Sequence, residues 1–265
     1  MMIWIGIEIR ILRFLLILMF SDLYQEHNNT VKYFLFQSIA SIILLLSLSL
    51  LGELKVLGTT IIMIKLGIAP FHLWFISLIN KVRIVNLIWL TVIQKIIPLR
   101  LIVVIKGSGR LITLLISSFF LSVVHMVVQT KLTTMVGASS VYSISWVVIS
   151  LISRESLIWY FFVLYCIFQI STLITVSLIR LSPFKPSSGS SFMKSKTLLA
   201  FRLNIAGFPP SFLFFTKLGV ILEILSREYL SIGLIIILGA RVVIYNYINI
   251  TIITFTISAR LCRFN

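Results

Sequence analysis

Long apolar stretches, interrupted by few polar residues, recur along the chain from Ile3 to Phe255. Each has about 20 residues, which is enough for an α-helix to cross a hydrocarbon core about 30 Å thick. The stretches are continuous and do not alternate polar with apolar residues over ten-residue segments, so helices are favoured over a β-barrel. The pattern predicts an all-α polytopic membrane protein in which residues 1–265 form a single transmembrane domain.

The apolar pattern predicts about nine transmembrane helices, with polar segments between them. Ser182 to Lys196 is rich in Ser, Pro, Gly and Lys, which predicts a polar loop outside the membrane. His27, between Glu26 and Asn28, is interpreted as a solvated loop residue. The expected helical stretches are Ile3 to Phe20, Val31 to Leu51, Leu54 to Phe75, Ile84 to Ile105, Leu111 to Gln129, Leu132 to Ser153, Leu157 to Leu181, a broken segment from Thr197 to Leu225, and Tyr229 to Phe255.

Composition excludes a soluble globular enzyme. Hydrophobic residues make up 59% of the chain and charged residues 11%, against roughly 45 to 50% and about 25% in soluble domains. The net charge of +16 comes from basic residues spread between apolar stretches. This distribution indicates that the basic residues set the membrane topology and contact anionic lipid headgroups, and it does not favour nucleic-acid binding. The two cysteines, Cys166 and Cys262, cannot build a disulfide framework or a metal cluster.

The distribution of cations predicts the orientation of the chain. With nine helices, Lys and Arg are more numerous on the side reached after the first helix than on the starting side. The positive-inside rule then places the N-terminus outside, away from the cytoplasm or matrix. This orientation depends on the helix count, because a miscounted helix reverses every later assignment.

Two lysines lie inside apolar stretches, and each is followed by a proline. Lys65, in the string IIMIKLGIAPFHLWF, precedes Gly67 and Pro70. Lys95, in LTVIQKIIPLR, precedes Pro98. A charge near the bilayer centre costs at least about 3 kcal/mol, so it needs a partner, water or a function. Because proline disfavours helix at the residue before it, we expect the helix to bend or break just beyond Lys65. The alternative is that Lys65 extends to the membrane interface.

A third lysine, Lys217, ends the segment NIAGFPPSFLFFTK. Gly207, Pro209 and Pro210 interrupt what is otherwise a helix of membrane length. Discontinuous helices expose backbone groups that are tolerated only against protein or a water-filled cavity, and they often lie at transport sites. We therefore predict a discontinuous helix carrying Lys217; a simple kink is the alternative.

Glu8 and two histidines complete the candidate residues. A carboxylate beside a buried lysine stabilises the charged form, whereas a buried lysine without a partner favours the neutral form; alternation between these states can move a proton. Glu8 could instead reach the outer surface. His72, after the Pro70 break, and His125, within LSVVHMVV, each serve as a proton relay or as a hydrogen-bonded packing residue. Other charges within or near the helices are Arg10, Arg13, Arg202, Arg241 and Glu223.

The string KLGIAPFHLWF, from Lys65 to Phe75, closely resembles the signature of subunit 2 of mitochondrial NADH:ubiquinone oxidoreductase, complex I. This subunit is one of the antiporter-like subunits of the membrane arm. Four further strings match in the family's order: IWIGIEI, VKYFLFQSIASIILL, QKIIP and NIAGFPPSFLFFTK. The matches cover most of the chain, and KLGxAPFHxW is the most specific of them.

The resemblance implies a role for each candidate. Glu8 and Lys65 would form an acid–lysine pair, Lys95 the central relay lysine and Lys217 the terminal lysine of a proton path, with His72 as a relay or structural residue. The helices of Lys65 and Lys217 would be the two discontinuous helices. The protein would be a core membrane-arm subunit that takes part in proton translocation across the mitochondrial inner membrane, coupled to electron transfer from NADH to ubiquinone.

The resemblance also implies partners and location. We expect no cofactor in this chain, because NAD, FMN, iron–sulfur clusters and ubiquinone belong to other parts of the complex. Partners would be the other membrane-arm subunits, supernumerary subunits and phospholipid such as cardiolipin, with no nucleic acid. The N-terminus would lie on the intermembrane-space side. The alternatives are a subunit of a cation/proton antiporter of the same fold and a structural membrane-arm subunit that does not pump.

The sequence departs from the family pattern after Gln129. The resembled family usually has a basic residue near Thr134, a tyrosine at Ala138 and a histidine at Ser143, none of which this sequence has. Branches of the proton path that reach the inner face through those groups therefore lack them here. The chain begins shortly before Glu8 and has about nine helices, so we expect an antiporter-like fold shortened at both ends.

Overall fold

The computed structural model describes residues 2–19, 24–49, 55–68, 70–79, 82–105, 109–129, 132–152, 155–181, 189–209 and 211–263. Within these ranges every regular element is a helix, which confirms the all-α prediction. The elements are α1 (Met2–Met19), α2 (Tyr24–Ser49), α3 (Lys55–Leu66), α4 (Leu73–Ile79), α5 (Ile84–Thr91), the 3₁₀ helix η1 (Ile93–Lys95), α6 (Ile96–Ile105), α7 (Gly109–Val128), α8 (Leu132–Ile149), the 3₁₀ helix η2 (Ser150–Ile152), α9 (Glu155–Leu181), α10 (Gly189–Ala206), α11 (Phe212–Ser226) and α12 (Leu230–Arg263).

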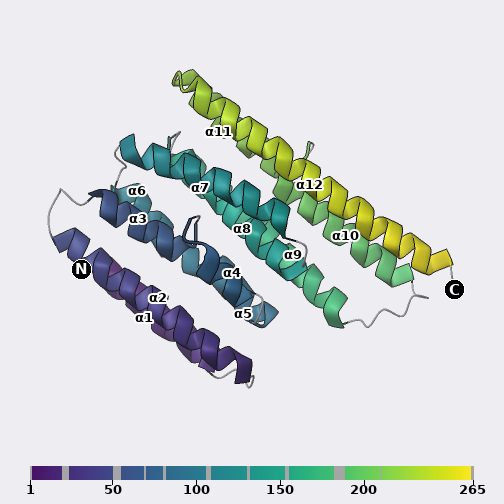
Figure 1. Ribbon diagram of the computed structural model, residues 1–265, viewed down its shortest axis with the longest axis horizontal. Coiled ribbons are helices and arrows are strands. Elements are labelled where there is room, and N and C mark those ends of the chain that lie inside the picture. Colours follow the sequence, from purple (N-terminus) through teal and green to yellow (C-terminus); the bar gives the residue numbers. More distant parts are fainter. Residues whose placement is uncertain are drawn as a thin grey trace.

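The helices lie side by side in a bundle that follows chain order (Figure 1). Helices α1 and α2 form one flank, α3 to α6 lie next to them, α7 to α9 follow, and α10 to α12 form the other flank. Contacts of α2 with α3, α4 with α8, α5 with α9 and α12 with α7 tie neighbouring groups together. The two chain ends therefore lie on opposite flanks.

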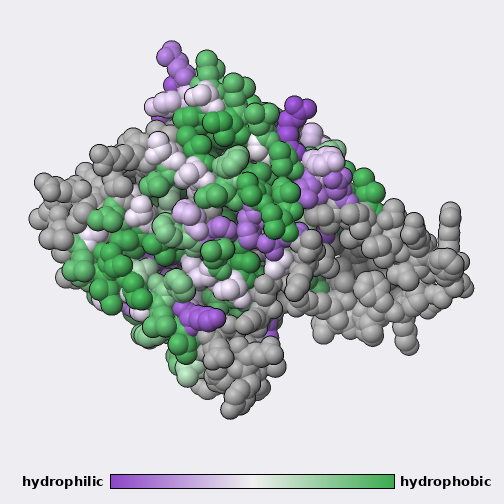
Figure 2. Space-filling model, in the orientation of Figure 1, coloured by the Kyte–Doolittle hydropathy of each residue, from purple (hydrophilic) through white to green (hydrophobic). Residues whose placement is uncertain are grey.

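Apolar side chains cover the outside of the bundle as well as its core. On α1, Ile7, Ile11 and Phe14 are buried, while Leu12 and Leu16 are exposed. Figure 2 shows hydrophobic residues over much of the described face, with polar residues scattered among them. Contiguous apolar surface of this kind marks a membrane or protein interface. Four helical stretches are long and apolar enough to cross a membrane: Thr30–Ser47, Val85–Val104, Leu157–Leu178 and Leu230–Asn249. The prediction of a polytopic membrane protein is confirmed; the number of membrane crossings stays a prediction.

Helix α8 is the centre of the bundle. All its described side chains, from Thr134 onward, are buried, as expected for a helix that is surrounded by other helices. Small residues permit this packing: a Cβ atom on Gly137 would lie 2.5 Å from Cδ1 of Ile79 in α4. Buried hydroxyls on α8, such as that of Ser139, donate to carbonyls one turn earlier. The helix therefore packs closely against its neighbours while the hydroxyls of Ser139, Ser140 and Ser145 donate within it; that of Ser143 has no partner among the described residues.

Two interruptions occur where the sequence predicts them. The chain leaves α3 at Gly67, which has φ +65°, and re-enters helix at Leu73. It leaves α10 at Gly207, with φ +83°, and re-enters helix at Phe212. Both glycines adopt the left-handed conformation that side-chain-bearing residues rarely take. Both discontinuous helices are thus part of the fold.

The third irregularity lies before Lys95 and not at the proline that follows it. Val92 has φ −113° and ψ −64°, and the next turn, Ile93–Lys95, is a 3₁₀ helix. Pro98 lies in the first turn of α6, where the missing N–H removes no hydrogen bond within that helix. A 3₁₀ turn inside a longer helical stretch often marks a functional hinge.

Two helices begin earlier than the sequence predicts. Helix α10 starts at Gly189, inside the expected polar loop 182–196; residues 182–188 lie outside the described ranges. The prolines of that loop, Pro183 and Pro186, both precede Gly189, so no residue after it excludes a helix. Helix α2 starts at Tyr24, which places His27 in a helix and not in a loop. No proline or glycine lies between Tyr24 and His27 to break the helix.

Candidate functional site

Lys95 is buried at the hinge between α5 and α6, with only 2% of its surface exposed. Its ammonium has no hydrogen-bond partner among the described residues. It lies 4.8 Å from the ring centre of Phe75 and 5.7 Å from that of Tyr165. Cation–π contact of this kind stabilises an ammonium away from water. Lys95 is thus held between aromatic faces, free of a fixed hydrogen bond.

Helix α1 clamps the 3₁₀ segment that carries Lys95. The guanidinium of Arg10 donates to the carbonyl of Ile93 at 2.7 Å. In the reverse direction, the side-chain amide of Gln94 donates to the carbonyl of Arg10 at 3.4 Å. A charged donor makes the first hydrogen bond the stronger of the two. The position of Lys95 therefore depends on α1 as well as on its own helix.

Tyr165 secures the same hinge from the other side. Its hydroxyl, on α9, donates to the carbonyl of Thr91 at 3.1 Å, where α5 ends. The ring below that hydroxyl is one of the two faces that contact Lys95. The buried side chain of Tyr165 therefore pairs the carbonyl of Thr91, which the irregular turn leaves free, and its ring packs against the Lys95 ammonium.

Lys65 lies in the last turn of α3 and is 5% exposed. Glu8, on α1, is half-buried, and its charge acts on both Lys65 and Tyr33. Among the described residues, the Lys65 ammonium and Oε1 of Glu8 have no hydrogen-bond partner. The fold therefore brings the acid and the lysine within electrostatic range and leaves them without a direct hydrogen bond.

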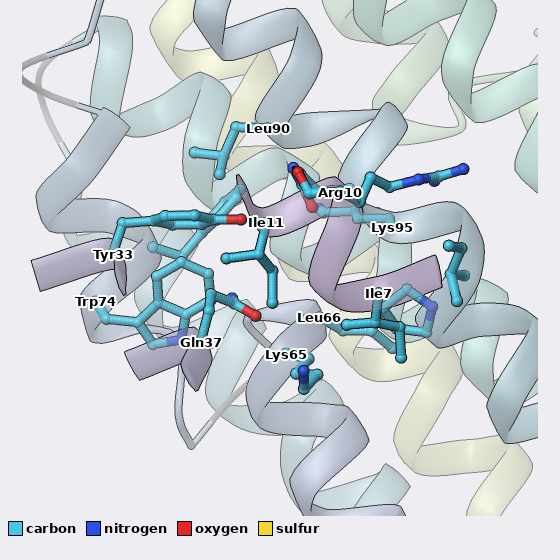
Figure 3. A pocket seen from close by; sticks show the side chains of 14 residues that line it. Ile7, Arg10, Ile11, Tyr33, Gln37, Lys65, Leu66, Trp74, Leu90 and Lys95 are labelled. Carbon is cyan, nitrogen blue, oxygen red and sulfur yellow. The ribbon is translucent and has the colours of Figure 1, made fainter. Parts of the chain in front are cut away.

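A small cavity links the two lysines (Figure 3). Its volume is about 20 Å³, which is enough for one water molecule. Tyr33 from α2, Lys65 from α3 and Lys95 from η1 line it, together with Gln37 and Trp74. The Trp74 indole also donates to the carbonyl of Ile64 at 3.2 Å, which ties α4 to the end of α3. The cavity therefore places the two buried amines around one space with several other polar groups, among them the Arg10 guanidinium.

Lys217 occupies the second interruption and is 5% exposed. Its ammonium donates to the carbonyls of Ile205 at 3.0 Å and Ala206 at 2.7 Å, where α10 ends. These carbonyls carry the partial negative charge of a helix C-terminus, which favours a cation. The rings of Tyr142 and Trp146 lie 4.9 and 5.5 Å from the ammonium. The broken helix thus supplies the acceptors that the buried lysine needs.

His72 and His125 contact each other, which the sequence does not predict. Their ring centres are 4.6 Å apart, with the planes at 75°. His72 is 7% exposed, and neither of its ring nitrogens has a partner within the described part of the chain. Nε2 of His125 lies 3.0 Å from the side-chain nitrogen of Gln129.

Helices α8 and α9 lie between the two lysine sites. Lys95 contacts Tyr165 of α9, and Lys217 contacts two rings of α8, while the two helices pack against each other. Gln169, one turn beyond Tyr165, is fully buried, and both its amide atoms lack partners among the described residues. Its signal in the sequence is an amide within the apolar run YCIFQIST. Sequence reasoning gave no role to Gln169 or to the buried cation Arg202.

The positions where the sequence departs from the family pattern are buried in α8. Thr134 and Ser143 are both inside the bundle, and the hydroxyl of Ser143 has no partner in the described residues. Neither side chain carries a proton that it exchanges near neutral pH. Thr134 and Ser143 therefore offer no titratable group to a proton path through α8.

Comparison with known proteins identifies the family. No protein-family profile matches the chain. It is 30% identical over 267 residues to NADH-ubiquinone oxidoreductase chain 2 of Lumbricus terrestris, covering 95% of this chain and 79% of that one. It is 25% identical over 275 residues to NADH-ubiquinone oxidoreductase chain 2 of Myxine glutinosa, covering 95% and 78%.

Solved structures share the fold at low identity. A chain of respiratory complex I from Thermus thermophilus with bound Aureothin superposes with a TM-score of 0.79 at 14% identity, over 94% of this chain and 64% of its own length. A chain of the Mrp complex from Dietzia sp. DQ12-45-1b gives 0.73 at 14% identity, over 86% and 50%. This chain therefore spans less than two thirds of those chains.

The interrupted helices and the likeness to these structures define a polytopic membrane protein of antiporter-like fold. Within that class the sequence relatives show which family the chain belongs to, because they match almost the whole chain. The chain belongs to the NADH-ubiquinone oxidoreductase chain 2 family.

Proposed function

We propose that this chain is a core membrane-arm subunit of respiratory complex I. In this role it takes part in proton translocation across the mitochondrial inner membrane, coupled to electron transfer from NADH to ubiquinone. The observation that carries the proposal is the burial of Lys65, Lys95 and Lys217, each beside an irregular or interrupted helix. Family membership supplies the coupling to NADH oxidation.

The arrangement of Glu8, Lys65 and Lys95 supports a transfer step. When the carboxylate of Glu8 is close, it stabilises the charged form of Lys65; when it withdraws, burial favours the neutral amine. The released proton can then cross the cavity that Lys65 shares with Lys95, through one water molecule. Phe75 and Tyr165 accept the resulting ammonium on their faces. Each amine returns to its starting state once the proton has moved on.

Lys217 would receive protons at the far end of this path. The carbonyls of Ile205 and Ala206 stabilise its charged form, and they exist as free acceptors only because α10 stops there. His72, at the start of α4, is a further proposed relay residue or a structural one. Redox chemistry belongs to other subunits, which hold NAD, FMN, iron–sulfur clusters and ubiquinone; this chain contributes proton carriers.

Other membrane-arm subunits and supernumerary subunits would cover the exposed apolar faces of the bundle. Cationic loops on the inner side would bind phospholipid such as cardiolipin. The N-terminus would face the intermembrane space, as the cation distribution predicts.

A cation/proton antiporter subunit is the second candidate function, because the fold also matches a chain of an Mrp complex. Gentle detergent extraction separates the two. Co-migration of this chain with a very large assembly that oxidises NADH supports the complex I subunit. A small particle without that activity supports the antiporter.

Lys95→Met tests the relay itself. Methionine keeps most of the length of the side chain and its apolar stem, but it lacks the ammonium that lies over the rings of Phe75 and Tyr165 and holds no proton. In sealed vesicles containing the assembled complex, we expect NADH-driven proton uptake to be lost while assembly persists. Lys32→Met, at an exposed position on α2, is the matched control and should pump normally. An assembled Lys95→Met complex that pumps fully contradicts the relay and supports a structural subunit that does not pump.

A further inference from the structure

A chain of three polar side chains runs from the first helix interruption to the end of α7. It begins at His72, whose carbonyl accepts from Ile76 at the start of α4. It continues to His125 through the ring contact at 4.6 Å and to Gln129 through the contact at 3.0 Å. Gln129 directly follows α7, so this chain leads from the centre of the bundle to a helix end.

The inner end of this chain lies one turn from a side chain of the lysine site. His72 lies one turn before Phe75, whose ring faces the Lys95 ammonium. Both residues follow the Gly67 interruption, which ends the helix of Lys65. His72 therefore immediately precedes the short helix α4, which carries a side chain that contacts the central lysine.

The two imidazoles are in contact but are not hydrogen-bonded to each other, so a proton passes between them only after a ring rotation brings nitrogen to nitrogen. At 75° the edge of one imidazole faces the ring of the other, and repulsion at this distance disfavours a charge on both rings at once. Neither nitrogen of His72 is held by a described partner. An imidazole that binds a proton on one nitrogen and releases one from the other passes a proton with no net change.

The Gln129 contact constrains His125. Because the amide nitrogen of Gln129 is a donor, the contact at 3.0 Å is a hydrogen bond when Nε2 of His125 accepts. In that tautomer Nδ1 carries the proton. The partly exposed Gln129 thus orients the imidazole at the outer end of the chain, and the imidazole itself carries the proton.

We propose that His72, His125 and Gln129 form an access branch that carries protons between the membrane surface at the end of α7 and the lysine site. This inference rests on the proposed function. The branch does not depend on Thr134 or Ser143 of α8, neither of which carries a group that titrates near neutral pH. His125 and His72 carry the proton, and Gln129 is a positioning residue.

Two substitutions of His125 separate proton transfer from packing. His125→Gln keeps a polar side chain that can hydrogen-bond to Gln129, whereas His125→Phe keeps only the ring. Neither replacement titrates, so both should slow NADH-driven proton uptake by roughly tenfold or more in vesicles containing the assembled complex. If His125→Phe does not assemble, His125→Gln still tests whether His125 carries protons.

Asn246→Ala is the matched packing control. Asn246, on α12, donates to the carbonyl of Met126 at 2.9 Å, so its removal disturbs the same turn of α7 without removing a titratable group. It should pump at the native rate. A native rate in His125→Gln, or an equal loss in Asn246→Ala, shows that His125 only packs and overturns the branch. If both His125 variants pump fully while Lys95→Met does not, the access branch is wrong and the proposed function stands. If Lys95→Met pumps fully, the proposed function itself is contradicted.

Discussion

The ammonium of Lys217 donates to the carbonyl of Ala206 across the interruption between α10 and α11. The bond depends on Gly207, whose φ of +83° turns the chain out of the helix. A Cβ atom at this glycine would lie 2.9 Å from Cδ and 3.0 Å from Nζ of Lys217. One residue without a side chain therefore sets both the break in the helix and the position of the lysine.

Gly207→Ala should destabilise the assembled complex and reduce proton uptake. The left-handed conformation costs a residue with a side chain about 1 to 2 kcal/mol, and the new methyl group displaces the lysine. Thermal unfolding and proton uptake in vesicles measure the two effects. Gly219→Ala, on α11, is the control, because a Cβ atom there meets nothing within 4 Å. Equal behaviour of the two variants contradicts the role of Gly207.

Arg10→Met should impair pumping without unfolding the bundle. The hydrogen bond from Arg10 to the carbonyl of Ile93 fixes the 3₁₀ turn that bears Lys95, and a hydrogen bond from a charged donor contributes about 1.5 to 3 kcal/mol. Its loss frees the hinge and misplaces the lysine. Arg13→Met, an exposed cation about one turn further along α1, is the matched control. Proton uptake per NADH oxidised is the measurement, and the same small loss in both variants would show that the clamp is dispensable.

Glu8→Gln and Lys65→Met should affect pumping in a non-additive way. The charge of Glu8 acts on Lys65. Once one partner is removed, removing the other should therefore cause little further loss of pumping. In a double-mutant cycle we expect the double variant to pump no worse than the poorer single variant. Independent losses that multiply would show that the two residues do not act as a pair.

Gln169→Leu should raise thermal stability and lower proton uptake. Both atoms of the buried amide lack partners in the described residues, and a buried polar group without a partner costs about 1 to 3 kcal/mol. The amide is therefore better explained by function than by packing. Ser171→Ala, on the same helix, is the control, because that hydroxyl already donates to the carbonyl of Phe168 at 2.8 Å. Stability gained with unchanged pumping would exclude Gln169 from the path.

The sequence by itself determined the helical class, the places of the discontinuous helices and the identity of the buried lysines. These features follow from local chemistry. Long apolar runs need a membrane, and glycine or proline ends a helix at its own position, so the breaks near Lys65 and Lys217 are visible in the strings KLGIAP and GFPP.

Only the tertiary structure decided how these residues meet. Pro98 suggests a bend after Lys95, yet the irregular turn precedes the lysine, where Arg10 and Tyr165 bind the freed carbonyls. His72 and His125 lie far apart in the sequence and touch in the bundle. Such contacts arise from the packing of one helix on another, and the order of residues within a single helix does not encode which neighbour its side chains will face.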